Sequence, residues 1–268
     1  MIENTLSKII EKKKFRINEL KKSVSLENLK KKINQYKPYL NFKNKIIKNN
    51  LNNKTSIIAE IKKASPSAGI IIENYNPVEI AEKYYKSNVT CLSVLTEEDF
   101  FLGKLDHIKN IKKNYQIPIL CKDFFIDTYQ VALAKSFGAD CILIILSAID
   151  IMLAKDLYQA ANDLNISTLV EVHSENEAEI ALSFENSIIG INNRNLKTLE
   201  ISLNTSIKLS KILNPHKNPL ICESGIHSIK EIKFIIENAK IHNFLIGESL
   251  LRSKDIASKL KEFAQITL

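Results

Sequence analysis

Apolar and polar positions form a repeating pattern from about residue 55 to the C-terminus. A short run rich in β-branched residues is followed by a polar loop, an amphipathic stretch of helical length, and then the next run. This order is typical of βαβ units, in which parallel strands alternate with covering helices. Eight such runs start 21 to 34 residues apart: 56–61, 90–95, 117–122, 140–146, 166–172, 187–192, 218–224 and 242–247.

Eight near-continuous apolar strands within about 210 residues predict an α/β fold, a (β/α)8 TIM barrel. An open doubly wound sheet is the structural alternative, but no GxGxxG turn follows the first predicted strand. Alternation within that strand places Ile58, Glu60 and Lys62 on one face. We therefore expect the two charged side chains to point into the mouth of the barrel.

Residues 1 to about 50 do not join the repeat. Their apolar positions recur at helical spacing at Leu6, Ile9, Ile10, Ile17, Leu20 and Val24. Pro38 marks the end of this pattern. We expect residues 1–268 to form a single barrel domain, of which residues 1–50 are an N-terminal helical extension packed on the barrel.

This extension also carries the positive charge of the chain. Residues 1–54 hold 14 Lys, one Arg and four Glu, a net charge of +11, so the remaining residues carry −3 of the total of +8. Blocks such as Lys12-Lys13-Lys14 and Lys30-Lys31-Lys32 lack the aromatic interleaving and signatures of nucleic-acid-binding proteins. We interpret them as a solvated helix face. A further hypothesis is that the extension packs over the barrel mouth and attracts an anionic substrate.

Several classes of protein do not fit this sequence. No segment is long and apolar enough to span a bilayer, and the first basic residues follow the apolar ones, the reverse of a signal peptide. The cysteines form no CxxC pair and lie in or beside apolar runs: Cys91, Cys121, Cys141 and Cys222. This placement is typical of reduced core thiols, with no disulfide and no metal site. We expect a cytoplasmic protein without a membrane or nucleic-acid partner. A monomer is the first expectation, and an oligomer stays open as the alternative.

Polar side chains stand at the C-terminal ends of the predicted strands, where barrel enzymes build their active sites. They are Glu60, Lys62, Ser93, Thr96, Lys122, Asp123, Glu171, Asn192, Arg194, Glu223 and Ser224. Single charges at the ends of five apolar strands favour acid–base chemistry over a structural layer of ion pairs. The last two strands end in Ser224-Gly225 and Gly247-Glu248-Ser249, each before a helix, and such helix N-termini bind phosphate.

Seven stretches carry a specific resemblance: IIAEIKKASPSAG (57–69), SVLTEEDFFLG (93–103), PILCKDF (118–124), LVEV (169–172), GINNRNL (190–196), ESGI (223–226) and FLIGESLL (244–251). In this order they resemble the indole-3-glycerol-phosphate synthase family, from about residue 5 to the end. The resemblance implies a lyase of tryptophan biosynthesis. It converts 1-(2-carboxyphenylamino)-1-deoxyribulose 5-phosphate, a small anionic substrate, to indole-3-glycerol phosphate, releasing CO2 and water without a cofactor.

The resemblance also implies catalytic roles. Lys122 is expected to be the general acid of ring closure, with a pKa that partial desolvation lowers toward neutrality. Glu171 is expected to be the acid of the dehydration step. Lys62 should bind substrate and could share in the dehydration, because the sequence does not divide duties between two lysines. Glu60 should stabilise the cationic intermediate and position the lysines.

Further residues are expected to bind the substrate. Arg194 offers a planar fork for the anthranilate carboxylate, with hydrogen bonds from Ser65 and Asn192. The apolar wall for the anthranilate ring is expected from Phe101, Phe124 and Leu143. The phosphate side of the site is expected from Glu223, Ser224, Gly225, Gly247, Glu248 and Ser249. We expect the backbone N–H groups to hold the phosphate, while the Glu248 side chain points away. The family usually has Asp where this chain has Asn195, a change expected to leave Arg194 with less electrostatic support.

Two alternatives remain open at this point. Phosphoribosylanthranilate isomerase is another phosphate-binding barrel, but it relies on a Cys base and an Asp acid instead of Glu60, Lys62, Lys122 and Glu171, and the chain is too short for both barrels. A non-enzymatic protein could instead dock its basic extension on nucleic acid. Its affinity would then depend steeply on salt and be lost on deletion of residues 1–40.

Overall fold

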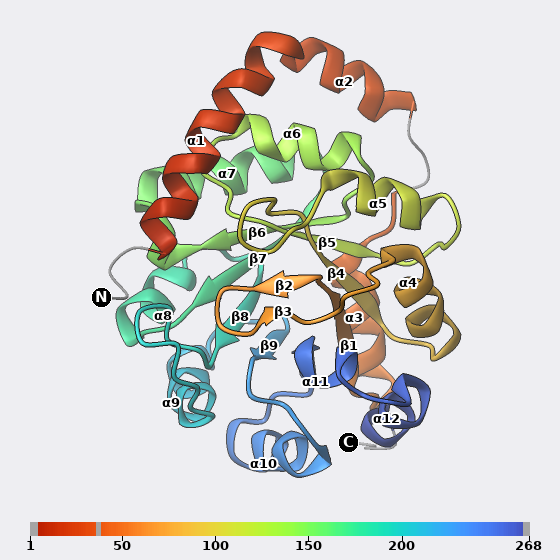
Figure 1. The fold of residues 1–268 in the computed structure, drawn as a ribbon. Helices are drawn as coiled ribbons and strands as arrows, with labels where there is room; N and C mark the ends of the chain where they lie inside the picture. The colour runs from red at the N-terminus through yellow and green to blue at the C-terminus, as the bar shows by residue number, and fades with distance from the viewer. Residues whose placement is uncertain (1–4, 36–38, 265–268) are drawn as a thin grey trace.

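The computed structural model describes residues 5–35 and 39–264, in which eight parallel strands form a closed barrel surrounded by helices (Figure 1). The barrel strands are β1 (Ser56–Ile61), β4 (Cys91–Leu95), β5 (Ile119–Lys122), β6 (Cys141–Ile145), β7 (Ser167–Val172), β8 (Ile188–Asn192), β9 (Leu220–Glu223) and β10 (Asn243–Ile246). Each pairs with the next, and β1 closes the ring against β10. The predicted TIM barrel is confirmed. Seven of the eight strands begin one or two residues later than predicted. The two largest differences are at β5 and β9, which begin directly after Pro118 and Pro219, because proline has no N–H for the ladder.

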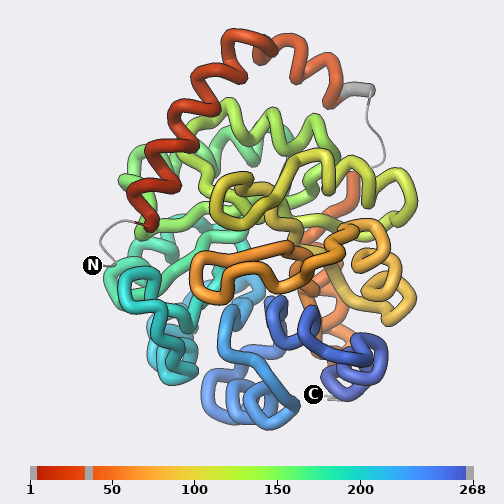
Figure 2. The backbone as a smooth tube through the Cα atoms, viewed as in Figure 1, coloured from red at the N-terminus to blue at the C-terminus, as the bar shows by residue number. Residues whose placement is uncertain are grey.

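Helices cover the outside of the barrel (Figure 2). They are α4 (Pro77–Lys86), α5 (Leu105–Lys112), α6 (Tyr129–Ser136), α7 (Ile151–Asp163), α8 (Glu175–Ala181), α9 (Asn204–Ile212), α10 (Ile229–Ala239), α11 (Glu248–Leu251) and α12 (Ile256–Ala264). Local signals start several of them: the side chains of Asn76, Asp150, Ser174 and Ser228 accept N–H groups of the first turn. Each capped start fixes how the preceding loop leaves its strand.

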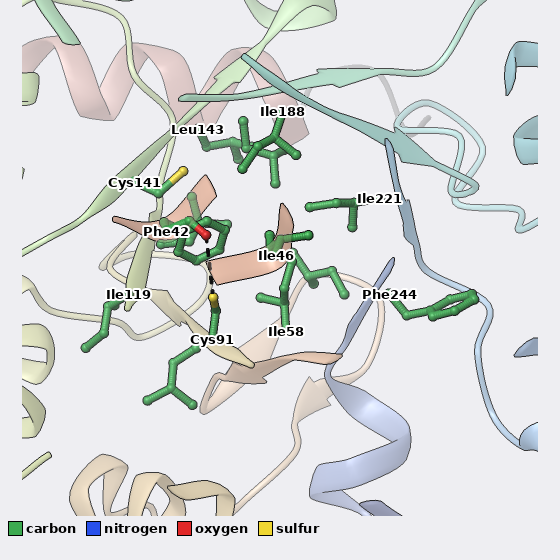
Figure 3. Packing of buried hydrophobic residues seen from close by; sticks show 14 of the residues in the cluster. Phe42, Ile46, Ile58, Cys91, Ile119, Cys141, Leu143, Ile188, Ile221 and Phe244 are labelled. Atoms are coloured by element: carbon green, nitrogen blue, oxygen red, sulfur yellow. Dashed lines mark hydrogen bonds between the residues drawn. The ribbon is translucent and has the colours of Figure 1, made fainter. Parts of the chain in front are cut away.

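A third helix of the N-terminal segment, α3 (Phe42–Leu51), closes the N-terminal end of the barrel. Phe42 and Ile46 are fully buried and belong to the barrel core, together with residues such as Ile58 and Leu143 (Figure 3). Just before α3, the Leu40 N–H donates to Asp140 Oδ1 at 2.7 Å, at the start of β6. With this end filled, only the C-terminal ends of the strands are left to form a mouth.

The first two helices pack against one side of the barrel. They are α1 (Thr5–Ser23) and α2 (Leu26–Gln35), and Figure 1 shows α2 lying along α6. Ile17, Leu29 and Ile33 form a second apolar cluster with Tyr129 and Leu133 of α6. The segment is therefore helical as predicted and is divided into three helices. Pro38, which was expected to end it, lies outside the described residues.

The prediction that the Lys12-Lys13-Lys14 block is entirely solvated is wrong for its central residue. Lys13 is only 6% exposed, and its Nζ lies 2.7 Å from Asp123 Oδ1. On the same helix Arg16 binds Asp99 through two hydrogen bonds, and Lys21 pairs with Asp127 at 2.5 Å. Acidic residues on the loops after β4 and β5 thus match basic residues of α1, which accounts for part of the opposite charge of the two segments.

A small hairpin in the loop after β1 was not anticipated. The strands β2 (Ala64–Ser65) and β3 (Gly69–Ile70) pair antiparallel, with Ser65 opposite Gly69. Gly69 has a φ of +63°, a conformation that costs glycine little. The hairpin brings Ser65 and Ser67 to the edge of the barrel mouth.

Other features concern partners and compartments. The four cysteines are buried and unpaired. Within residues 5–35 and 39–264 there is no helix with the length and hydropathy needed to cross a membrane. Across the same ranges, His, Cys, Asp and Glu side chains form no group of three or more suited to a metal ion.

Candidate active site

A cavity opens at the C-terminal ends of the strands. Ser93 and Thr96, two of the polar residues at strand ends, are buried and do not line it, but every residue expected to act in catalysis or to bind substrate does. These are Glu60, Lys62, Ser65, Phe101, Lys122, Phe124, Leu143, Glu171, Asn192, Arg194, Glu223, Ser224, Gly225, Gly247, Glu248 and Ser249. Thr5, Leu6 and Ile9 of α1 also line the cavity, a contribution that helical spacing alone could not assign to the mouth. The N-terminal extension therefore forms part of the cavity wall.

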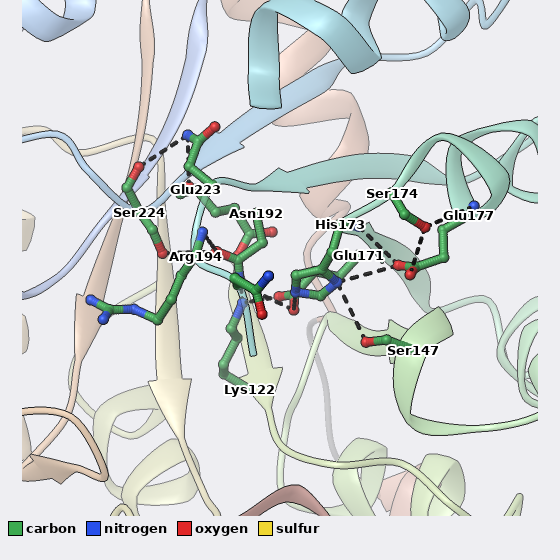
Figure 4. A network of polar contacts seen from close by, with 12 residues as sticks. Lys122, Ser147, Glu171, His173, Ser174, Glu177, Asn192, Arg194, Glu223 and Ser224 are labelled. Atoms are coloured by element: carbon green, nitrogen blue, oxygen red, sulfur yellow. Dashed lines mark hydrogen bonds and ion pairs between the residues drawn. The ribbon is translucent and has the colours of Figure 1, made fainter. Parts of the chain in front are cut away.

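Lys122, the last residue of β5, lies between two carboxylates (Figure 4). Its Nζ is 2.8 Å from Glu171 Oε2, at the end of β7, and 2.6 Å from Glu223 Oε2, at the end of β9. All three side chains are at least 87% buried, since Lys122 is 13% exposed and the two glutamates only 3% and 2%. Such a buried pair of contacts fixes the ammonium group at the floor of the cavity.

The expectation that the pKa of Lys122 is lowered is wrong. Burial does act to lower this pKa, but the charges of Glu171, Glu223 and Glu60 outweigh burial and raise it above the ordinary lysine value. The sequence suggested desolvation and could not show that two carboxylates touch the same Nζ. Lys122 is therefore an ammonium ion at neutral pH, which is the proton-carrying form.

Glu171 and Glu223 occupy different electrostatic environments although both contact Lys122. Burial acts to raise the pKa of Glu171, but Lys122 and His173 hold it below its ordinary value. Burial raises the pKa of Glu223, and the negative charge of Glu171 adds to this shift against the opposing effect of Lys122. Glu223 Oε1 is buried and makes no hydrogen bond among the described residues. Of the two, Glu171 is the carboxylate and Glu223 is the group that more readily holds a proton.

Glu60 and Lys62 form their own ion pair instead of contacting Lys122 directly. Glu60 Oε1 lies 2.6 Å from Lys62 Nζ. A Cβ atom at Gly247 would lie 2.4 Å from the same Oε1, so glycine leaves space for the carboxylate. Gly190, within β8, has a similar relation to Glu223, because a Cβ there would lie 2.1 Å from Glu223 Oε1. The spacing of glycines in the sequence did not reveal this function of Gly190.

Asn192 and Asn193 hold the ends of β8 and β9 together. Asn192 Nδ2 donates to Glu171 Oε1 at 3.2 Å, and its Oδ1 accepts from Ser224 Oγ at 2.9 Å. The buried Asn193 Nδ2 donates to the backbone oxygens of Glu223 and Ser224 at 3.0 and 3.1 Å. These bonds hold the backbone at Glu223 and in the turn that follows it.

The Asn195 side chain caps a turn and makes no hydrogen bond to Arg194 in the described part of the chain. Asn195 Oδ1 accepts the N–H groups of Lys197 and Thr198 at 2.8 and 3.1 Å. Arg194 Nη1 instead donates to Leu199 O at 3.2 Å, across the turn that Asn195 caps. An Asp oxygen could accept the same two N–H groups, so Asn in place of Asp keeps these hydrogen bonds of the turn.

An apolar wall and a turn-lined side face each other across the cavity. The Phe101 and Phe124 rings lie 6.3 Å apart, and the buried Glu97 carboxylate accepts the Phe101 N–H at 3.0 Å. On the other side, Ser224 and Gly225 follow β9 with φ values of +65° and +86°.

The short helix α11 begins at Glu248, next to that turn. The first N–H groups of a helix have no acceptor within it, so they are available to an anion. The Glu248 side chain pairs with Arg252 at 2.9 Å, at the surface.

Two residues next to this site were missed by the sequence analysis. His173 follows β7 directly, and its Nε2 lies 3.3 Å from Glu171 Oε1 (Figure 4). Glu177 in α8 lies 3.3 Å from His173 Nδ1. A signal was present, because Ser174 and Glu177 have the spacing of a capping box after a strand end. No cysteine of the described chain lines the cavity, so the cysteine base of the isomerase alternative is lacking.

Comparisons with known proteins find one family over nearly the whole chain. Residues 6–263 match the family model of indole-3-glycerol phosphate synthase. A relative of that name from Polynucleobacter necessarius is 40% identical over 97% of this chain and 99% of its own. Another of that name from Prochlorococcus marinus is 41% identical over 97% of this chain and 89% of its own.

Solved structures show the same fold. The tryptophan synthase alpha chain from Legionella pneumophila covers 84% of this chain and 97% of its own, with a TM-score of 0.62 and 14% identity. The tryptophan synthase alpha subunit from Pyrococcus furiosus, in a mutant form, covers 80% of this chain and 99% of its own, with a TM-score of 0.61 and 13% identity. At such identities the likeness concerns the barrel alone. The matched family and the two relatives place the chain more narrowly: it belongs to the indole-3-glycerol phosphate synthase family.

Proposed function

We propose that Lys122 is the general acid of ring closure in this family's reaction, the conversion of 1-(2-carboxyphenylamino)-1-deoxyribulose 5-phosphate to indole-3-glycerol phosphate, CO2 and water. The observation that carries this proposal is the position of Lys122 Nζ, 2.8 and 2.6 Å from two buried carboxylates at the floor of the cavity. When the ring carbon that bears the carboxylate attacks the ribulose carbonyl, a C–C bond forms and the carbonyl oxygen takes a proton. A fixed ammonium group supplies that proton.

The loss of CO2 then requires no further proton from the enzyme. The bond to the carboxylate breaks, and its electrons restore the aromatic ring. The new hydroxyl must next leave as water, which needs a second proton, and the adjacent carbon must lose one to complete the indole. The whole sequence takes up two protons and releases one, in balance with the loss of a carboxylate as CO2.

Glu171 is the proposed acid of the dehydration, and its environment gives the order of events. In the resting site Lys122 and His173 keep Glu171 ionised. Once Lys122 has given up its proton, the ammonium charge 2.8 Å away is lost, and the pKa of Glu171 rises. Glu171 then takes up a proton from solvent and donates it to the hydroxyl, the C–O bond breaks as water leaves, and the Glu171 carboxylate accepts the proton that the adjacent carbon loses and returns it to solvent, from which Lys122 is also reprotonated. The protonated, neutral form of Glu171 therefore becomes available only after ring closure.

Glu60 and Lys62 act on the substrate from the end of β1, whereas Lys122 and Glu171 act from the ends of β5 and β7. Their ion pair of 2.6 Å lies at the end of β1 and both side chains line the cavity. We assign Lys62 to substrate binding and to sharing the proton transfers of the dehydration. Glu60 stabilises the cationic intermediate and positions Lys62.

The cavity lining supports one orientation of the substrate. The phosphate lies at Ser224 and Gly225, in the turn after β9, and at Gly247 and Ser249, at the start of α11. The anthranilate ring lies on Phe101 and Phe124 with Leu143. Arg194, Ser65 and Asn192 bind the anthranilate carboxylate, near the carbon that reacts. In this orientation the carbonyl lies between the two ends, above Lys122.

We also propose that residues 1–268 act as one domain, as a monomer in the cytoplasm, without a nucleic-acid partner. Buried, unpaired cysteines suit a reducing compartment. The ion pairs of Lys13, Arg16 and Lys21 with the barrel give part of the basic charge a partner within the chain.

The assay for this function follows indole fluorescence during incubation of the full chain with the carboxyphenylamino-deoxyribulose phosphate. We expect indole-3-glycerol phosphate and CO2 in equal amounts. No product from folded protein would reject the proposed function.

A further inference from the structure

Behind Glu171 lies a chain of polar contacts that points away from the cavity. Glu171 Oε1 is 3.3 Å from His173 Nε2, and His173 Nδ1 is 3.3 Å from Glu177 Oε2 (Figure 4). His173 does not line the cavity, so it has no contact with substrate there. Its side chain is 10% exposed, which leaves it largely out of water.

Glu177 is held rigidly against the imidazole. Its Oε2 accepts the backbone N–H of His173 at 2.9 Å, and its Oε1 accepts Ser174 Oγ at 2.9 Å. Ser147, in the turn η1 (Leu146–Ala148) after β6, approaches His173 Nδ1 at 3.4 Å from a third element. Contacts from β7, α8 and η1 therefore fix the ring plane. The remaining ring nitrogen, Nε2, is buried and makes no hydrogen bond among the described residues, but it lies 3.3 Å from Glu171 Oε1, close enough for its charge to act on that carboxylate.

We propose that His173 is a positioning residue that, as an imidazolium clamped by Glu177, orients the Glu171 carboxylate and controls when it takes up a proton. This inference rests on the proposed function, in which Glu171 delivers the dehydration proton. The proposed function leaves Glu171 without a neighbouring cation once Lys122 has become neutral. The inference adds a second cation, behind Glu171, that remains after that step.

The charged groups around this position favour the imidazolium. Glu171 and Glu177 face His173 directly, while Lys122 and Glu223 lie beyond Glu171. Burial acts to lower the pKa of His173, but the close contacts and negative charges of Glu171 and Glu177 outweigh it and raise the pKa to about 9. The cation is therefore present across neutral pH.

The test is the pH profile of kcat for His173→Gln, with wild type and His216→Gln measured in parallel. His216 is a half-buried histidine whose Nε2 contacts Ser187 O at 2.9 Å, at the opposite end of β8 from the cavity. Loss of the cation raises the pKa of Glu171, so the profile of His173→Gln moves to higher pH by about one unit. We expect kcat to fall about tenfold with KM nearly unchanged, because the substrate is not contacted.

A second variant separates charge from packing. In Glu177→Gln the imidazole remains but loses the carboxylate charge beside it, so the pKa of His173 falls toward its ordinary value. The pH profile of kcat then differs from wild type in the same direction as that of His173→Gln, but only above about pH 7. A profile of His173→Gln that coincides with that of wild type, whatever its kcat, would overturn the inference. If wild type itself makes no product, the proposed function fails instead, and the two failures are thereby distinguished.

Discussion

Lys13 of the N-terminal helix forms a buried ion pair with Asp123, the residue that follows Lys122. The two side chains are 7% and 9% exposed, and Asp123 Oδ2 also accepts a hydrogen bond from Thr96 Oγ1 at 2.7 Å. The pair ties α1 to the end of β5, directly beside the proposed general acid.

Removal of Lys13 should therefore destabilise the protein and disturb catalysis. In Lys13→Met the Asp123 carboxylate stays buried without its cation, which costs about 3 kcal/mol of unfolding free energy. We also expect a lower kcat, because the loop after Lys122 loses its anchor. Urea unfolding and steady-state kinetics measure both effects, with the exposed neighbour Lys14→Met as the matched control. Equal stability of the two variants would contradict a structural role for the pair.

His173 predicts a pH-dependent component of stability. Its pKa is raised from 6.5 to about 9 by Glu171 and Glu177 against the effect of burial. A raised pKa in the folded state gives stability that is fully present below pH 6.5 and is lost as the pH rises through about 9. The shift corresponds to at most about 3 kcal/mol. The difference in unfolding free energy between wild type and His173→Gln should shrink over this range; a difference constant from pH 6 to 10 would be evidence against the imidazolium.

Gly190 should be intolerant of a side chain because of Glu223. In Gly190→Ala the new Cβ would lie 2.1 Å from Glu223 Oε1 and 2.7 Å from Leu169 Cδ2. We expect a loss of about 2 kcal/mol of stability and a fall in kcat, as Glu223 moves away from Lys122. The second substitution Glu223→Asp, which shortens the acid, should restore part of the stability. No recovery in Gly190→Ala/Glu223→Asp would assign the cost to Leu169.

Asn195 should be exchangeable for Asp with little effect. Its Oδ1 accepts two backbone N–H groups, and its side chain does not contact Arg194. We expect kcat/KM of Asn195→Asp within about twofold of wild type, and a loss of about 1 kcal/mol of stability in Asn195→Ala, which removes the cap. An increase of tenfold or more in Asn195→Asp would show that residue 195 supports Arg194 after all.

The sequence predicted the barrel and the composition of its mouth because both follow from local patterns. Apolar runs at regular spacing mark strands, and a strand end places residues such as Lys122 and Glu171 at one rim. Contacts between elements distant in sequence could not be predicted in this way. The rise in the pKa of Lys122 depends on two carboxylates meeting one Nζ, and the burial of Lys13 depends on where α1 docks. His173 lay one residue beyond a recognised motif, and its role depends on the direction of its ring.

The order of proton transfers is the central claim, and single-turnover measurements of CO2 and indole formation test it most directly. We expect Lys122→Met to release neither product at an appreciable rate, with kcat lower by about 100-fold or more, because ring closure precedes the loss of CO2. The exposed Lys109→Met of α5 serves as the control and should behave like wild type. Glu171→Gln should release CO2 faster than it forms indole, since dehydration alone is impaired. CO2 release from Lys122→Met at the wild-type rate, or strictly parallel CO2 and indole formation in Glu171→Gln, would contradict the account.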